Sequence, residues 1–331
     1  GFKEYVAPFQ NLSALNVFLI TLTLMVGTAG LPHVIIRFYT VPKASDARWS
    51  AGWALVFIGL LYTTAPAVAV FSKYNLLNTL ANKPVEEVRQ IDWVQKWEQT
   101  GLLKLQDKNG DGILQMSANP DVNEVTIDRD IIVLSTPEVA KLSPFIVGLV
   151  AAGGLAAALS TAAGLLIVIA SAISHDLYTR LINPGASEAT KLLIARVVIF
   201  LVVVLAAPFG INPPAFIAQL VAFAFGLAAS TFFPAILLGI FDRRMNMQGA
   251  VAGMIVGLVF TASYIIGTKY LGWPNFILGI TAEGIGAIGM LLNFVVAYLV
   301  SRATPPPPEE IQHLVDEIRI PKGSAGSALE H

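Results

Sequence analysis

Seven long apolar segments constrain the fold of this sequence more than any other feature. Each is about as long as the 20 residues that a helix needs to cross a bilayer. Each is continuous rather than alternating in polarity, which favours helices over a barrel. Only 13% of the 331 residues are charged, against roughly a quarter in a soluble domain. We therefore expect an all-α, polytopic membrane protein with about seven transmembrane helices, from the segments 12–40, 50–73, 143–173, 190–208, 213–241, 247–270 and 274–301.

Composition excludes several classes of function. The chain has no cysteine, which excludes disulfides and thiolate metal sites. Its net charge of −1 provides no strongly basic field, so nucleic acid is not an expected partner, whereas membrane lipid is. The apolar segments carry no nucleophile–base set, phosphate-binding loop or metal cluster, and we expect no enzyme activity.

Basic residues in the short loops predict the orientation of the chain. They fall on one side of the predicted membrane, while the 208–213 turn has none and the 269–275 turn has only Lys269. We expect a multi-pass protein of the plasma membrane (the bacterial inner membrane) with a cytoplasmic C-terminus. A chain that begins outside without a signal peptide is expected to be the second part of a longer polypeptide. The basic loop residues are Arg37, Lys43, Arg48, Arg180, Lys191, Arg243, Arg244 and Arg302.

The predicted organisation has four parts. Residues 1–73 hold two transmembrane helices, and residues 142–303 hold five. Between them lies a polar extracytoplasmic domain, the cap (residues 74–141), with one segment of helical periodicity and a segment, "VTIDRDIIVL", that favours strand. Residues 304–331 form a cytoplasmic, proline-rich tail that opens with "TPPPPEE". A short amphipathic helix is expected there, with Ile311, Leu314, Val315 and Ile318 at helical spacing.

The cap contains a sequence that resembles a calcium loop. In "DKNGDG", Asp107, Asn109 and Asp111 match the first, third and fifth positions of an EF-hand, and Gly112 matches the sixth. The twelfth position, which should be a bidentate Glu, is Ala118. Weak calcium binding and a polar turn without metal are both open interpretations.

The first apolar segment has its poorest helix formers in the middle. Gly27, Gly30 and Pro32 favour an interruption near residues 27–33, and non-helical backbone at membrane depth is tolerated where it lines a cavity. Transporters bind substrate at such broken helices. We therefore consider Gly27, Thr28, Gly30 and His33 as substrate-binding candidates. A proline kink that serves packing, with His33 as a buried neutral histidine, is the alternative.

The third apolar segment carries two hydroxyl side chains near its centre. Ala157, Ser160 and Thr161 have the spacing i, i+3, i+4 and share one helical face. A small residue exposes its carbonyl, and the hydroxyls add oxygens that a hard cation prefers. Packing of small and hydroxyl residues against another membrane helix is the alternative. Further on, Gly249, Gly253 and Gly257 also share a face and predict a close helix contact.

Together these segments resemble the sodium:solute symporter family, in particular its acetate and monocarboxylate permease branch. The resemblance covers about residues 1–73 and 142–302. It is most specific in the helix that ends in Asp176, Leu177 and Tyr178 and in the basic hairpin that follows the fifth segment. The matching segments are "GTAGLPHVIIRFYTV", "ARWSAGWALVFIGLLYTTAPAVAV", "AAALSTAAGLLIVIASAISHDLY" and "LLGIFDRRMNMQGAVAGMIVG".

The resemblance implies the second part of a leucine-transporter-type five-plus-five inverted repeat. It implies sodium-coupled uptake of a small organic anion, with acetate as the model substrate. Aligned through Asp176-Leu177-Tyr178, the family's sodium ligands fall on the carbonyl of Ala157 and the hydroxyls of Ser160 and Thr161. The remaining ligands would come from N-terminal helices of the same transporter, which this sequence lacks. A symporter-like sensor with a ligand-binding or calcium-binding cap, and a channel, are the alternative functions.

Overall fold

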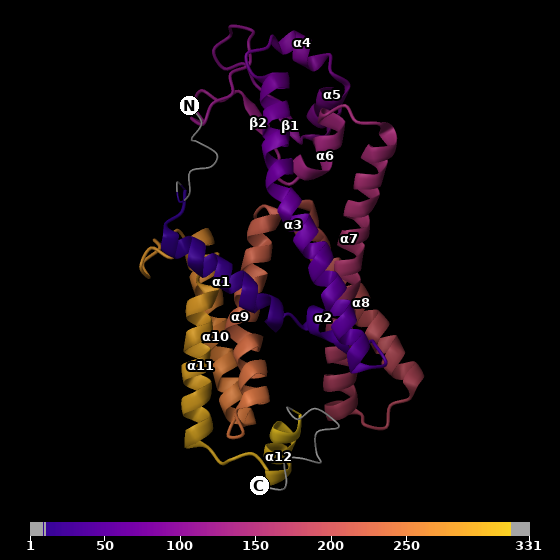
Figure 1. The fold of residues 1–331 in the computed structure, drawn as a ribbon, viewed down its shortest axis with the longest axis vertical. Helices are drawn as coiled ribbons and strands as arrows, with labels where there is room; N and C mark the ends of the chain where they lie inside the picture. Colours follow the sequence, from indigo (N-terminus) through magenta and orange to yellow (C-terminus); the bar gives the residue numbers. More distant parts are fainter. Residues whose placement is uncertain (1–8, 10, 319–331) are drawn as a thin grey trace. The chain divides into compact units, whose positions relative to one another are not determined.

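The computed structural model describes residue 9 and residues 11–318, and most of them are helical. Six helices are long and apolar enough to cross a membrane, and a bent pair at the start makes a seventh if it is counted as one span (Figure 1). The prediction of an all-α polytopic membrane protein is therefore confirmed. The six helices are α3 (Ala44–Leu80), α7 (Pro144–Ser171, continued to Ile182), α8 (Glu188–Ile211), α9 (Ile217–Phe241), α10 (Met247–Tyr270) and α11 (Gly286–Ala303).

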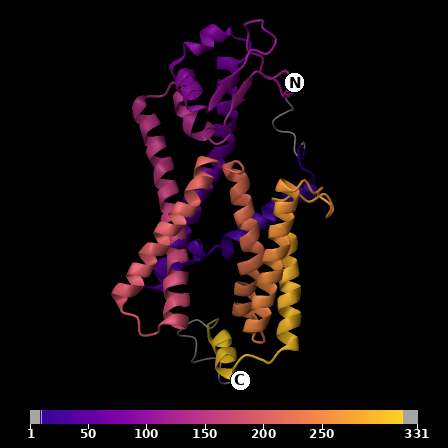
Figure 2. The ribbon, with the colours of Figure 1, turned by 180° about the vertical axis from the view of Figure 1, so that it is seen from behind.

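The chain forms two compact units. The first unit, residues 38–216, contains the cap and helices α3, α7 and α8. In the second, residues 9–37 and 217–318, helix α1 (Ala14–Gly30) packs on α9, and α9, α10 and α11 lie side by side in both ribbon views (Figure 2). Each unit has its own contacts and is described by itself.

Glycine allows the three helices of the second unit to approach closely. A Cβ atom on Gly249 would lie 2.7 Å from the carbonyl oxygen of Ala297 in α11. One on Gly253 would overlap the side chain of Asn293, and one on Gly257 would overlap the carbonyl oxygen of Ser230 in α9. The expected close contact on this face of α10 is therefore confirmed.

A buried amide completes the hydrogen bonding of α9 at its proline. Pro234 has no N–H, so the carbonyl of Ser230, four residues earlier, loses its helical donor. Asn293, which is fully buried in α11, donates from Nδ2 to the carbonyl oxygens of Ser230 at 2.8 Å and Thr231 at 2.9 Å. Satisfying freed carbonyls inside a membrane is energetically important because no water is available.

The last span is shorter than the sequence predicts. The apolar run begins near residue 274, but helix α11 begins at Gly286. Leu278 and Gly279 have left-handed backbone (φ 50° and 68°), which a helix excludes. Asn16 of α1 then binds this loop, donating to the Gly279 carbonyl at 3.0 Å and accepting from the Thr281 amide at 2.8 Å. Tertiary contacts thus fold residues 274–285 against α1 rather than into a helix.

The same loop holds a carboxylate whose titration is testable. Burial alone would raise the pKa of Glu283, but hydrogen bonds from Gln219 and Lys269 outweigh it and lower the pKa to about 2. Lys269 Nζ lies 2.9 Å from its Oε1. Because the folded-state pKa lies below the unfolded value, ionised Glu283 stabilises the fold above about pH 4.5, and this contribution is lost as the pH falls toward 2.

Replacing Glu283 by Gln should therefore destabilise the protein in a pH-dependent way. At about pH 7 we expect a loss of about 1.5–3 kcal/mol, the range for a hydrogen bond to a charged group. Thermal unfolding in detergent should show the wild-type and variant midpoints converging as the pH falls below about 4. A difference that stays constant with pH would contradict an ionised Glu283.

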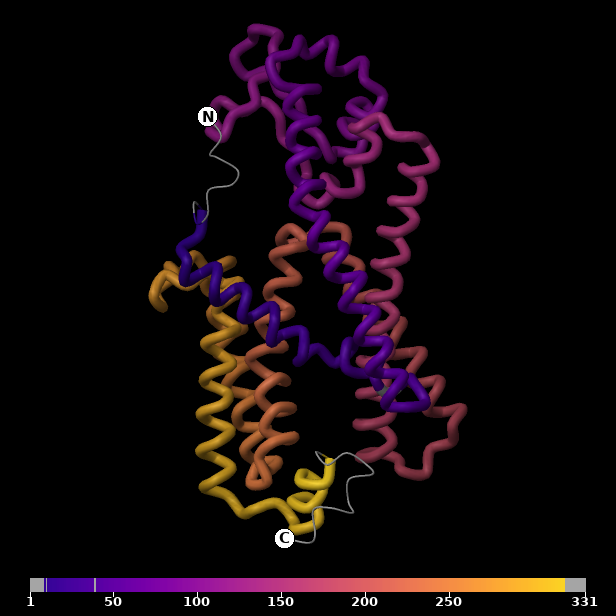
Figure 3. Tube along the Cα trace, viewed as in Figure 1, coloured from indigo at the N-terminus to yellow at the C-terminus, as the bar shows by residue number. Residues whose placement is uncertain are grey.

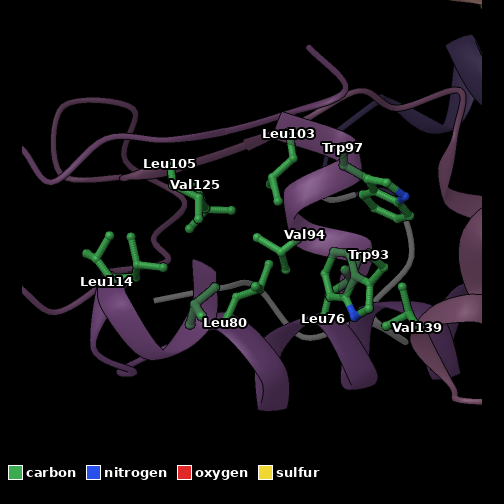
Figure 4. Close-up of a cluster of buried hydrophobic side chains, with 12 residues drawn as sticks. Leu76, Leu80, Trp93, Val94, Trp97, Leu103, Leu105, Leu114, Val125 and Val139 are labelled. Atoms are coloured by element: carbon green, nitrogen blue, oxygen red, sulfur yellow. The ribbon is translucent and has the colours of Figure 1, made fainter. Parts of the chain in front are cut away.

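In the first unit, α3 runs without interruption into the cap. Its last two turns contribute Leu76 and Leu80 to a buried apolar cluster with residues of α4 (Val85–Arg89), α5 (Asp92–Thr100) and α6 (Ile132–Val139) (Figure 4). Trp93 and Trp97 of α5 meet edge to face within this cluster, 4.6 Å apart between ring centroids. The other members are Val85, Val88, Val94, Leu103, Leu105, Leu114, Val125 and Val139.

The strand prediction in the cap is confirmed only in part. Strands β1 (Leu103–Leu105) and β2 (Val125–Ile127) pair antiparallel, with Lys104 opposite Thr126. The remainder of "VTIDRDIIVL" turns and enters helix α6 at Ile132. The hydroxyls of Thr136 in α6 and Ser72 in α3 are hydrogen-bonded, which secures α6 to the end of α3.

The expected amphipathic helix of the tail is α12 (Glu309–Glu317). It buries Val315, and its Asp316 pairs with Arg243 of the α9–α10 loop at 3.2 Å. Asn246 in that loop binds Thr304 and Pro305 at the start of the tail. The first part of the predicted tail is therefore packed on the second unit, and residues 319–331 lie outside the described residues.

Candidate ion and substrate site

Helix α7 presents the sodium candidates on one exposed face. Ala157, Ser160 and Thr161 lie near the middle of Pro144–Ser171, and all three side chains are exposed among the described residues. The hydroxyls of Ser160 and Thr161 make no hydrogen bond within the part of the chain that the structure describes. Because Ser160 and Thr161 are consecutive, two hydroxyl oxygens without a hydrogen-bond partner among the described residues lie next to each other along an apolar helix.

Several exposed threonines on apolar helices bond to their own helix, although the exposed Ser171 of α7 and Ser263 of α10, like Ser160, make no hydrogen bond among the described residues. Thr28 donates to the Leu24 carbonyl at 2.8 Å, and Thr63 and Thr64 of α3 donate to carbonyls one turn earlier, including that of Leu60. Such a bond to the preceding turn is the ordinary way to satisfy a hydroxyl in a membrane helix. The oxygens of Ser160 and Thr161 remain available as ligands.

The helix ends in an unusual geometry at Asp176, Leu177 and Tyr178. A π-helix covers Ala172–Ile182, and it includes Asp176, Leu177 and Tyr178. The side-chain hydroxyl of Thr179 donates to the Ser174 carbonyl, five residues earlier, at 2.8 Å. Runs of π-helix are rare and are frequently found at functional sites. The sequence contained no signal for this geometry.

The first span is interrupted where the glycines and the proline predicted it. Helix α1 ends at Gly30, Leu31 is extended, and helix α2 (Pro32–Ile35) begins with the proline at its first position. The two segments differ in direction by 53°, and the trace turns between them in Figure 3. A 3₁₀ turn, Ile36–Tyr39, follows α2. The predicted broken helix is thus present in the structure.

The four substrate candidates on this segment have different surroundings. Gly27 and Gly30 pack on the backbone of α9, and a Cβ on Gly30 would lie 2.6 Å from the Ala228 carbonyl oxygen. Thr28 is exposed and bonded to its own helix. His33 is half-buried, and its Nδ1 is buried without a hydrogen-bond partner among the described residues. Close packing accounts for the glycines, whereas His33 retains a free polar atom; a substrate role for each stays a prediction.

The calcium interpretation of the cap loop gains no support. Within residues 11–318, no three His, Asp or Glu side chains are grouped as a metal site requires. Asp107 accepts hydrogen bonds from the amides of Gly110 and Gly112, and Asn109 donates to Asp111 at 2.9 Å. These contacts are those of a polar turn.

The loop is organised by a buried carboxylate. Glu124 is 2% exposed, and it accepts from the amides of Lys108 at 2.8 Å, Asn109 at 3.4 Å and Gln115 at 2.8 Å. This role of Glu124 could not be predicted from the sequence, because three backbone donors converge on it only after strands β1 and β2 have paired.

Replacing Glu124 by Ala should loosen the cap. The change removes the carboxylate acceptor of three partly buried backbone amides, and a typical hydrogen bond contributes about 0.5–1.5 kcal/mol. We expect trypsin to cleave the variant faster at Lys104 and Lys108, as measured by limited proteolysis of the purified protein. Asp121→Asn, at an exposed carboxylate nearby, serves as the control and should cleave at the wild-type rate. Equal rates for Glu124→Ala and the control would contradict this role.

Known proteins with similar sequences include a symporter and a transporter, as the resemblance of the quoted segments implies. The chain is 41% identical over 313 residues to an uncharacterized symporter of Cupriavidus necator, covering 92% of this chain and 45% of that protein. It is 31% identical over 252 residues to the monocarboxylic acid transporter of Corynebacterium glutamicum, covering 72% of this chain and 36% of that protein. The chain thus spans less than half the length of these relatives. Residues 116–257, from the cap through α7, α8 and α9 into α10, match the sodium:solute symporter family, and the chain therefore contains a domain of that family.

Proposed function

We propose that the protein containing this chain is a secondary transporter that couples sodium entry to uptake of a small organic anion, with a short-chain monocarboxylate such as acetate as substrate. One observation carries the proposal. Within a sodium:solute symporter domain, Ser160 and Thr161 present two unbonded hydroxyl oxygens on the apolar helix α7. The relative named a monocarboxylic acid transporter supports the substrate class.

The proposed sodium ligands are the carbonyl of Ala157 and the hydroxyls of Ser160 and Thr161. These oxygens are neutral, which suits a monovalent ion that must also leave the site. In the proposed five-plus-five repeat, the remaining ligands come from N-terminal helices beyond this sequence, and the broken segment α1–α2 faces the substrate. Sodium binding favours the outward-open state, which then binds the anion more tightly. Transport in this scheme requires no covalent chemistry.

Uptake by proteoliposomes tests the proposal. The full-length protein should accumulate labelled acetate or pyruvate when an inward sodium gradient is applied, and an inward potassium gradient should not replace it. An amino acid serves as the substrate of a different class. A sensor would bind an anion without flux, and a channel would not saturate at low solute concentration, so either result would overturn symport.

His33→Gln tests the substrate side of the site. An imidazolium would favour an organic anion, and the unperturbed pKa of histidine is about 6.5. We expect the apparent KM of the variant to rise and its uptake to lose any increase that the wild type shows as the pH falls. His313→Gln, at an exposed histidine of α12, is the control. Unchanged KM and pH profile in His33→Gln would remove this residue from the site.

A further inference from the structure

The cap contacts the helix that carries the sodium candidates. Leu134 of α6 is 44% exposed, and its Cδ2 would lie 2.8 Å from a Cβ atom added to Gly154 of α7. Gly154 leaves room for the end of the leucine side chain, which would have to move if a Cβ atom were added. The neighbouring Gly153 has no atom within 4 Å of the corresponding position. The contact is thus specific to one side of the helix.

This side of α7 is the side of the proposed ion ligands. Gly154, Ala157 and Thr161 have the spacing i, i+3, i+7, and they follow one stripe along the helix. At about 1.5 Å of rise per residue, Leu134 packs about 4–5 Å from the level of Ala157 along the axis. At this distance the Leu134 side chain can influence the rotation of α7 about its axis and the position of the ligand oxygens along the membrane normal.

The leucine is held on a rigid support. Helix α6 is secured to α3 by the Ser72–Thr136 hydrogen bond, and its Val139 belongs to the apolar cluster of the cap. Helix α7 itself is sparsely packed: of the residues in Pro144–Ser171, only Ala170 is buried among the described residues. Its described neighbours are α6, α8 and the π-helix. Because α7 has few packed residues, its contact with Leu134 has a large effect on the position of the helix.

We propose that Leu134 is a positioning residue for the sodium site, and that its contact with Gly154 places Ala157, Ser160 and Thr161 for ion binding. The inference rests on the proposed sodium function of α7. It gives the cap a direct effect on ion affinity, because any displacement of α6 moves the contact on Gly154. Ligand oxygens must be held within about 0.5 Å of their productive positions, so a small displacement suffices.

The experiment is a double-mutant cycle in sodium-driven uptake by the full-length protein. Gly154→Ala adds the Cβ atom that meets Leu134, and we expect the sodium concentration for half-maximal uptake to rise about two- to thirtyfold, the range for coupling through packed residues. The maximal rate at saturating sodium should change less. Leu134→Ala removes the δ-carbons, and Gly154→Ala combined with Leu134→Ala should lie closer to wild type than Gly154→Ala alone. Gly153→Ala is the matched control and should behave as wild type.

The possible outcomes separate the two proposals. Sodium-dependent wild-type uptake with equal half-saturation in Gly154→Ala and Gly153→Ala would overturn the positioning role of Leu134. Loss of rate without a change in sodium half-saturation would also overturn it, since that result indicates a structural defect. Wild-type uptake that does not depend on sodium would instead overturn the proposed function. Sodium-dependent stabilisation of the purified protein against heat, measured without substrate, should follow the same order of variants.

Discussion

Replacing Ser160 and Thr161 together by Ala should abolish the sodium dependence of uptake at physiological sodium concentrations. The change removes two of the three ligand oxygens that this chain offers and leaves the Ala157 carbonyl. If each is comparable to a hydrogen bond to a charged group, the loss is about 1.5–3 kcal/mol per oxygen. The sodium concentration for half-maximal uptake should then rise by about a hundredfold or more, since two oxygens are lost and about 1.4 kcal/mol corresponds to a factor of ten.

The chain offers a matched control for this variant. Thr63 and Thr64 of α3 are also adjacent, exposed hydroxyls on an apolar helix, but both are bonded to carbonyls of the preceding turn. Thr63→Ala with Thr64→Ala should keep the wild-type sodium response. Thr161→Ser, which retains the oxygen, should also respond to sodium. An unaltered sodium response in the Ser160 and Thr161 double variant would show that the site lies elsewhere.

The features that were predictable from the sequence are those determined over short distances along the chain. Continuous apolar runs predicted the long helices, and Gly30 with Pro32 predicted the break that the structure places at Leu31. The i, i+4 spacing of Gly249, Gly253 and Gly257 predicted a close contact because only sterics along one helix face were needed. In each case local geometry and the membrane together leave few alternatives.

The features that could not be predicted depend on residues far apart in the chain. Residues 274–285 are apolar enough for a helix, but Asn16 and Tyr264 bind their backbone and hold a loop. Leu134 meets Gly154 only because α6 is secured to α3. Asn293 did leave a signal, an amide within an apolar run, and such residues in membrane helices usually have a partner. Its partner could be identified only once α9 and α11 were side by side.

The second large effect is expected from Gly257→Ala. The new Cβ atom would overlap the carbonyl oxygen of Ser230, which is backbone and already accepts from Asn293. Backbone cannot rotate away as a side chain can, so α10 must move off α9 at a cost of about 3 kcal/mol or more. We expect a lower thermal midpoint and loss of the monodisperse peak in size-exclusion chromatography. Gly239→Ala, at an exposed position of α9 with open space around it, should leave both unchanged.

Gly253→Ala distinguishes backbone obstruction from side-chain obstruction on the same face. Its Cβ would overlap the side-chain oxygen of Asn293, a group that mutation can remove, and would also lie 2.8 Å from the Ala297 Cβ and 2.9 Å from the Asn293 carbonyl oxygen. Asn293→Ala alone should cost about 1–2 kcal/mol, because it leaves the freed carbonyl of Ser230 without a donor. Combined with Gly253→Ala it should cost less than the sum of the two, whereas combined with Gly257→Ala it should give no relief. Equal relief for both glycines would mean that Asn293, rather than the backbone of α9, limits the approach of α10.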